Sequence, residues 1–181
     1  MRRILMAMLM SVMVMVCGIC SAQITEKDLN IGGIYIGQSM DEIVAKYGNP
    51  IRKEPWGAKG NAYVFVINGS EIAITLSKDR DVCGFSIKGN SKLILPSGIG
   101  LYASMDSIIK TYGQPDFNKV VARTDRGNII HFGYKTPERK YSPDLDNSPM
   151  IYDMITFIID VNNNISSIFV STEVVSDVVM P

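Results

Sequence analysis

One twelve-residue segment occurs twice in this chain. Residues 39–50 read SMDEIVAKYGNP, and residues 104–115 read SMDSIIKTYGQP. In each copy the first serine can cap a helix, and the glycine and proline near the end can stop it. Between them, apolar residues recur at the spacing of one helix face. The duplicated segment therefore predicts two short helices with matching boundaries.

Segments rich in β-branched and aromatic residues follow each predicted helix, and this composition is typical of strands. Asn68-Gly69 separates the first two segments and favours a tight hairpin. A short helix is not stable alone, so each helix should lie on a sheet. We therefore predict an α+β fold of two tandem units, each a short helix packed on an antiparallel sheet of three to four strands. The predicted strands are residues 61–67, 70–77 and 82–89 in the first unit, and 128–135, 154–161 and 165–175 in the second.

The repeat also predicts the domain organisation. Residues 1–22 read as a leader, 23–92 as the first α+β repeat, and 93–181 as the second. The second repeat contains an additional segment, 136–153, which is rich in proline, tyrosine and charge. It is either a solvated extension of a hairpin or a recognition loop, since long loops on a rigid scaffold often carry function.

The leader has the pattern of a secretory signal peptide. Two arginines precede an apolar run, and small residues end it at Ala22. We expect cleavage near Ala22 and an exported protein that is periplasmic or secreted. An uncleaved membrane anchor and a lipoprotein modified at Cys17 or Cys20 are the alternatives.

The charge and cysteine content of the mature chain exclude several classes of function. Removal of the leader leaves two more acidic than basic residues and no block of like charge. We therefore expect no nucleic-acid partner and no membrane insertion after cleavage. Cys83 is the one cysteine outside the leader, so an internal disulfide is excluded, and we expect a small buried side chain.

No catalytic, metal or cofactor motif stands out. His131 is the single histidine of the chain, and no paired cysteine or histidine spacing accompanies it. Asp160, Asn162 and Asn164 match the start of a calcium loop, but Asp/Asn-rich turns form for conformational reasons alone. We predict no catalytic residue, no metal and no cofactor.

The segment GIYIGQSMDEIVAKYGNP, followed by antiparallel strands, resembles the small exported domains of the β-lactamase-inhibitor-protein type. The unit is also distantly similar to the BamE/SmpA outer-membrane assembly lipoproteins. Two tandem copies are closer to the inhibitor arrangement, in which paired domains form one concave sheet surface. This resemblance implies a non-enzymatic protein that binds another protein. The second copy departs from the first by having Tyr102 in place of Gly37, so we expect the loop before that helix to differ.

Aromatic residues outside the periodic apolar faces are the candidate contacts for a protein partner. Trp56 lies in a predicted loop, and Tyr141 and Tyr152 lie in the inserted segment. Exposed tryptophan and tyrosine are typical anchors of protein recognition. We therefore predict a protein-binding module that uses sheet surface and loops. The alternatives are a BamE-like assembly or structural factor, and an enzyme with carboxylate chemistry in the cleft between the repeats.

Overall fold

The computed structural model describes residues 24–56, 60–141 and 148–175. The predicted signal peptide, with Cys17 and Cys20, lies outside the described residues. The elements in chain order are η1 (Glu26–Asp28), β1 (Asn30–Ile31), β2 (Ile34–Tyr35), α2 (Met40–Tyr47), β3 (Arg52–Pro55), β4 (Asn61–Ile67), β5 (Ser70–Leu76), β6 (Val82–Lys88), α3 (Met105–Tyr112), β7 (Phe117–Thr124), β8 (Gly127–Lys135), β9 (Arg139–Lys140), β10 (Met150–Ile159) and β11 (Ile165–Val174).

Both predicted helices are present, with the predicted boundaries. The hydroxyls of Ser39 and Ser104 each accept a hydrogen bond from a backbone N–H three residues later, at 3.2 Å and 3.3 Å. Gly48 and Gly113 follow the helices with φ of 82° and 79°, a backbone region that favours glycine. The capping and stop residues of the duplicated segment therefore act as expected in both copies.

The prediction of two helix-on-sheet units is wrong, because the strands form one sheet. β3 to β6 pair in sequence order, and β6 then pairs antiparallel with β11, which continues into β10, β8 and β7. β9 pairs with β10 beside this path, which gives nine strands. Within the described residues, two eight-residue helices accompany this sheet, so the fold is mostly β. Pairing of β6 with β11 removes two open edges that separate sheets would expose.

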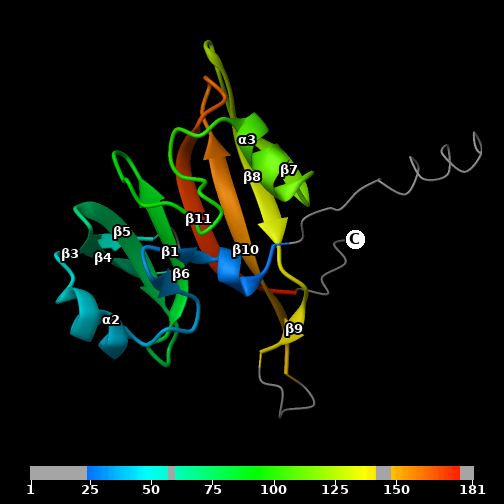
Figure 1. The fold of residues 1–181 in the computed structure, drawn as a ribbon. Helices are drawn as coiled ribbons and strands as arrows, with labels where there is room; N and C mark the ends of the chain where they lie inside the picture. Colours follow the sequence, from blue (N-terminus) through cyan, green and yellow to red (C-terminus); the bar gives the residue numbers. More distant parts are fainter. Residues whose placement is uncertain (1–23, 57–59, 142–147, 176–181) are drawn as a thin grey trace, which may run out of the picture.

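One hydrophobic core lies on a single face of this sheet. It includes Ile43 from α2, Ile108 from α3, and the fully buried rings of Phe65, Phe85 and Phe157. Figure 1 shows α2 beside the β3–β6 half, α3 beside β7 and β8, and the N-terminal segment between them. Both helices therefore cover the same face, and they share the core with the N-terminal segment.

The loops that precede the two helices share one backbone conformation. Gly37 has φ of 83°, and Tyr102 has φ of 67° although it is not a glycine. The N–H of Gly37 donates to the Val82 carbonyl, and the N–H of Tyr102 donates to the Ile165 carbonyl, each at 2.8 Å. Our expectation that the second loop differs is therefore wrong for the backbone. The Tyr102 side chain is 62% exposed, and its hydroxyl donates to the Gly89 carbonyl at 2.8 Å.

Candidate functional site

The second face of the sheet carries no helix within the described residues. Strand alternation places Val64, Ala73, Ser86 and Phe169 on this side, opposite the helix-covered core. A small buried cluster of Ala62, Val64 and Ala73 lies there. We call this side the helix-free face.

A groove of about 620 Å³ lies on the helix-free face, where β6 meets β11. Trp56 and Phe169 line it as an edge-to-face pair, with ring centroids 5.7 Å apart. Thr75, Ser86 and Ser171 add hydroxyl groups to its wall. Its size is within the range of ligand pockets, and it combines aromatic surface with hydrogen-bonding groups. The described lining consists of Glu54, Pro55, Trp56, Asn61, Thr75, Leu76, Cys83, Ser86, Lys88, Phe169, Ser171, Thr172 and Glu173.

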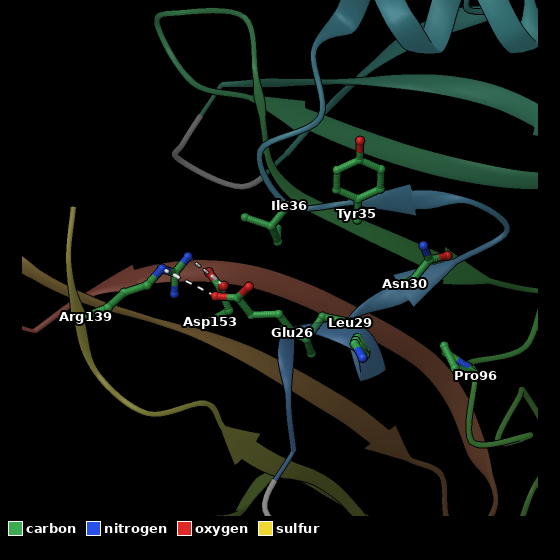
Figure 2. Close-up of a pocket in the computed structure, with 9 residues that line it drawn as sticks. Glu26, Leu29, Asn30, Tyr35, Ile36, Pro96, Arg139 and Asp153 are labelled. Atoms are coloured by element: carbon green, nitrogen blue, oxygen red, sulfur yellow. Dashed lines mark ion pairs between the residues drawn. The ribbon is translucent and has the colours of Figure 1, made fainter. Parts of the chain in front are cut away.

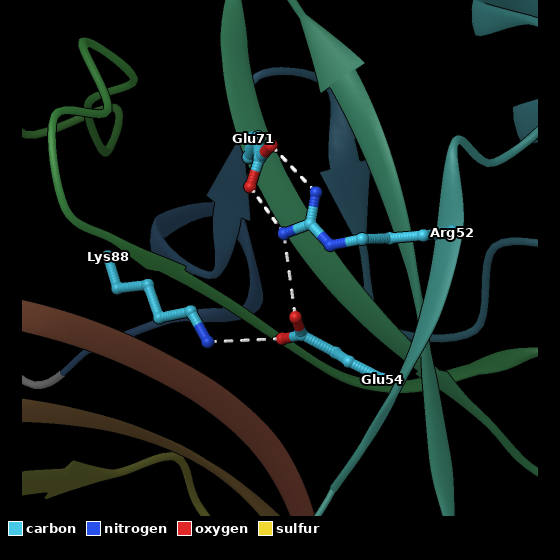
Figure 3. A network of polar contacts seen from close by, with 4 residues as sticks. All are labelled: Arg52, Glu54, Glu71 and Lys88. Atoms are coloured by element: carbon cyan, nitrogen blue, oxygen red, sulfur yellow. Dashed lines mark hydrogen bonds and ion pairs between the residues drawn. The ribbon is translucent and has the colours of Figure 1, made fainter.

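A chain of ion pairs, shown in Figure 3, begins at one rim of the groove, where Glu54 and Lys88 belong to the lining. The two terminal nitrogens of the Arg52 guanidinium contact the carboxylate of Glu71 at 2.7 Å and 2.6 Å, a bidentate arrangement. Glu54 continues the chain, 3.5 Å from Arg52 and 3.1 Å from Lys88. The Arg52 hydrogen bonds lower the pKa of Glu71, and the same pair raises the pKa of Arg52. These exposed pairs hold long side chains in place, although each contributes little stability.

The structure brings two of the three predicted contact residues to the helix-free face. Trp56 is half-buried and lies in the groove. Tyr152 is half-buried on β10, opposite Glu173 of the groove lining, and the Lys135 ammonium lies 4.5 Å from the Tyr152 ring centroid. Tyr141 is 57% exposed beside the short strand β9 and is not among the described groove residues.

The described part of the inserted segment is an extension of a hairpin. β9 pairs with the first residues of β10, and the N–H of Tyr141 donates to the Pro149 carbonyl at 2.9 Å. Residues 142–147 lie outside the described residues. The choice between a solvated extension and a recognition loop therefore stays open.

Sequence reasoning missed the groove residues of β6 and β11. Phe169 lies between two core residues, Ile168 and Val170, and strict alternation along this strand was the signal for its opposite orientation. Cys83 is half-buried instead of fully buried, because a register shift after Thr75 turns it into the groove lining. Its sulfur lies 3.7 Å from the Thr75 hydroxyl.

A second cavity of about 410 Å³ opens between η1, the β1–β2 hairpin and the base of β9 (Figure 2). Its floor contains Asp153, which is 2% exposed and lies 2.8 Å from a terminal nitrogen of Arg139. The Thr172 hydroxyl donates to the other Asp153 oxygen at 2.6 Å. Glu26 approaches the same guanidinium at 3.9 Å. The carboxylates of Asp153 and Glu26 therefore both face one arginine side chain.

His131 and Asp160, which the sequence also singled out, do not line either of these two cavities. His131 lies on β8, and burial followed by the charge of Lys119 lowers its pKa. Asp160 accepts hydrogen bonds from the backbone N–H groups of Asn162 and Asn164, at 2.8 Å and 3.0 Å, which confirms the turn interpretation.

Nowhere in the described ranges do three or more His, Cys, Asp or Glu side chains gather as a metal site. Among the described helices, none is long and apolar enough to cross a membrane.

Comparisons with known proteins extend only to the fold. No protein-family model matches the chain, and no curated protein matches it. A cysteine-rich secretory protein from Staphylococcus aureus is 14% identical with a TM-score of 0.50, and the match covers 84% of this chain and 49% of that one. An extracellular SCP-domain protein from Bacillus anthracis is 12% identical, with a TM-score of 0.48 and coverage of 75% and 43%. A DUF4309 family protein from Bacillus subtilis is 14% identical, with a TM-score of 0.47 and coverage of 84% and 88%. The chain thus spans less than half of the first two proteins, and its likeness to the Staphylococcus aureus protein is one of fold.

Proposed function

We propose that this is an exported, non-enzymatic protein that binds another protein through the groove on its helix-free face. The observation that carries the proposal is the half-buried Trp56–Phe169 pair on a sheet face that no described helix covers. A tryptophan in a shallow, polar-rimmed groove has the properties of an interface hot spot. The ion-paired rim supports the proposal, because preorganised charges reduce the cost of ordering side chains on binding.

The proposal of export rests on the leader pattern that ends at Ala22. The Staphylococcus aureus neighbour is described as secretory, and export of this chain would agree with that description. N-terminal sequencing of the protein recovered from its producing cells tests this part of the proposal. Recovery of a chain that begins after residue 22 supports it, and an intact N-terminus at Met1 contradicts it.

The enzyme alternative depends on the two carboxylates around Arg139. Proton transfer requires a carboxyl group that can take up and release a proton near the working pH. Both oxygens of Asp153 already contact donors, and the Glu26 carboxylate lies 3.9 Å from the same Arg139 guanidinium. The contacts in this cavity fit a structural ion pair better than an acid–base pair, so we retain binding as the proposal.

The test places a photo-reactive amino acid at one of two positions of the full chain without its leader. Ser171 lies in the groove, and Tyr102 is exposed before α3. After irradiation in envelope and culture fluid, mass spectrometry identifies the cross-linked protein. We expect one specific protein to be cross-linked from position 171 and not from position 102.

Affinity measurements with the identified partner then test the aromatic pair. We expect Trp56→Ala and Phe169→Ala each to raise Kd at least tenfold, as expected of hot-spot residues. Ile94→Ala removes a side chain that is 57% exposed outside the groove, and this control should leave Kd unchanged. Thermal unfolding of each variant shows whether it is folded. If folded Trp56→Ala and Phe169→Ala proteins bind as tightly as the unchanged chain, the groove is not the binding surface.

A further inference from the structure

The strand β7 is an open edge of the sheet. It is the last strand in the sheet order, and β8 is its sole partner among the described strands (Figure 1). Seven of its eight residues are exposed. The opposite edge strand, β3, has four residues and ends in Pro55, which has no N–H group to donate. β7 is therefore the longer and less protected of the two edges.

The side chains of β7 suit an extended partner. The register with β8 shifts between Val120 and Ala122, which leaves Val121 as the bulged residue. Val120 and Val121 are 39% and 42% exposed, so two β-branched side chains remain available at the edge. At its start, β7 is held to the sheet by the Phe117 ring, which lies over Gly133 of β8. The strand is thus anchored to β8, and no described strand pairs with its outer side.

The hairpin of β7 and β8 has a positive charge that the rest of the chain lacks. Residues 117–135 contain four basic side chains and one acidic side chain, whereas the whole chain has a net charge of zero. Lys119, Arg123 and Arg126 take part in no ion pair within the described residues. A partner at this edge would therefore meet unpaired positive charge.

We propose that β7 accepts an extended, acidic peptide segment of another protein as an additional strand. Backbone N–H and C=O groups at the open edge provide the hydrogen bonds of such strand addition, and the neighbouring side chains select the sequence. Lys119 and Arg123 favour carboxylates in the added strand, and Val120 and Val121 favour β-branched residues. This surface is separate from the groove, because β10 and β8 lie between β11 and β7 in the sheet.

Bulges and lysines at an edge are also devices that prevent unwanted strand pairing. The test must therefore distinguish strand addition from simple charge attraction. The probes are a synthetic peptide of alternating valine and glutamate as long as β7, the same peptide N-methylated at alternate residues, and polyglutamate. N-methylation removes backbone donors and leaves the charge unchanged. Isothermal titration with the full chain lacking its leader measures affinity, and amide hydrogen exchange locates the protected residues.

We expect the unmodified peptide to bind and to slow exchange within residues 117–124. N-methylation should weaken binding at least tenfold. Lys119→Gln with Arg123→Gln should also weaken it, whereas Lys78→Gln with Lys92→Gln, which removes the same charge elsewhere, should not. Trp56→Ala should leave peptide binding intact, which keeps this result independent of the groove.

Three outcomes would overturn the proposal. Binding of polyglutamate and of the N-methylated peptide as tight as that of the unmodified peptide would show charge attraction without strand pairing. No binding of any probe at millimolar concentration would show that the edge is protected. Concentration-dependent self-association that protects β7 amides in the absence of peptide would assign the edge to a second copy of the chain.

Discussion

The pairing of β6 with β11 predicts that the two halves of the sheet unfold together. Ile87 of β6 and Ile168 of β11 are directly opposite each other in the core, and both are fully buried. Ile168→Ala removes three buried carbons at the junction between the halves. It therefore tests whether a substitution that destabilises one half of the sheet also destabilises the other half.

The expected loss of stability follows from the burial of this site. Replacement of a fully buried isoleucine by alanine costs about 3 kcal/mol, because it removes transfer free energy and leaves a cavity. A loss of about 3 kcal/mol lowers Tm by roughly 6–12 °C in a domain of this size. The control Ile94→Ala removes an exposed side chain, and its effect on the unfolding free energy should stay within about 0.5 kcal/mol.

Differential scanning calorimetry and far-UV circular dichroism provide the measurement. We expect a single transition in the unchanged chain and in Ile168→Ala, with equal calorimetric and van't Hoff enthalpies. The whole transition should move to lower temperature in the variant. Two transitions, of which only one moves in Ile168→Ala, would refute the reasoning and restore two independent units.

Three further predictions concern single side chains. Burial lowers the pKa of His131 in the folded chain below its usual 6.5, so the unfolded chain binds the proton more tightly. The contribution of neutral His131 to the free energy of unfolding is therefore complete above pH 6.5 and is lost as pH falls through the lower pKa of the folded chain. His131→Gln should remove this pH dependence, as measured by urea titrations at several pH values. Asp153→Asn leaves Arg139 without its closest buried partner and should lower the free energy of unfolding by about 2 kcal/mol, less than for a fully buried pair because Arg139 is partly exposed. The control is the same substitution in an Arg139→Met background, where the loss should be smaller. Equal losses in the two backgrounds would contradict the pairing. Gly133→Ala would place a methyl group against the Phe117 ring and should lower the free energy of unfolding by about 1–3 kcal/mol. It should also speed amide hydrogen exchange in β7. Unchanged exchange would show that the ring does not anchor this edge.

The local elements of the fold could be predicted from the sequence because their signals are short in range. Ser39 and Ser104 specify helix starts through bonds three residues away, and the hydrogen-bond network of Asp160 forms within one turn. The Asn68-Gly69 hairpin was predicted in the same way, and β4 and β5 pair across it. In contrast, the β6–β11 pairing joins residues about eighty positions apart, for example Ile87 and Ile168. Both strands have apolar alternation suited to either an edge or an interior position, so sequence pattern could not distinguish one sheet from two.

The same difference explains which parts of the candidate site were predicted. Trp56 was singled out because it stands outside any periodic apolar face, and it lines the groove. Tyr152 was singled out for the same reason, and it lies on the same face of the sheet without lining the groove. Phe169 and Ser86 were missed because they share the groove only after β6 and β11 have paired. The cavity around Asp153 was missed for a related reason, since Arg139 and Glu26 approach it from distant parts of the chain.

The two copies of the duplicated segment keep the same contacts to the sheet even where their residues differ. The N–H of Met40 donates to the Arg80 carbonyl, and that of Met105 donates to the Asn163 carbonyl, each at 3.0 Å. Arg80 and Asn163 both have positive φ, of 67° and 62°, at corresponding turns between strands. Backbone hydrogen bonds that tolerate such different side chains hold each helix in position on the sheet. The two surfaces proposed to bind partners are instead ones without a counterpart in the other half of the sheet, namely the groove at the β6–β11 junction and the basic edge at β7, and the proposed variants test them separately.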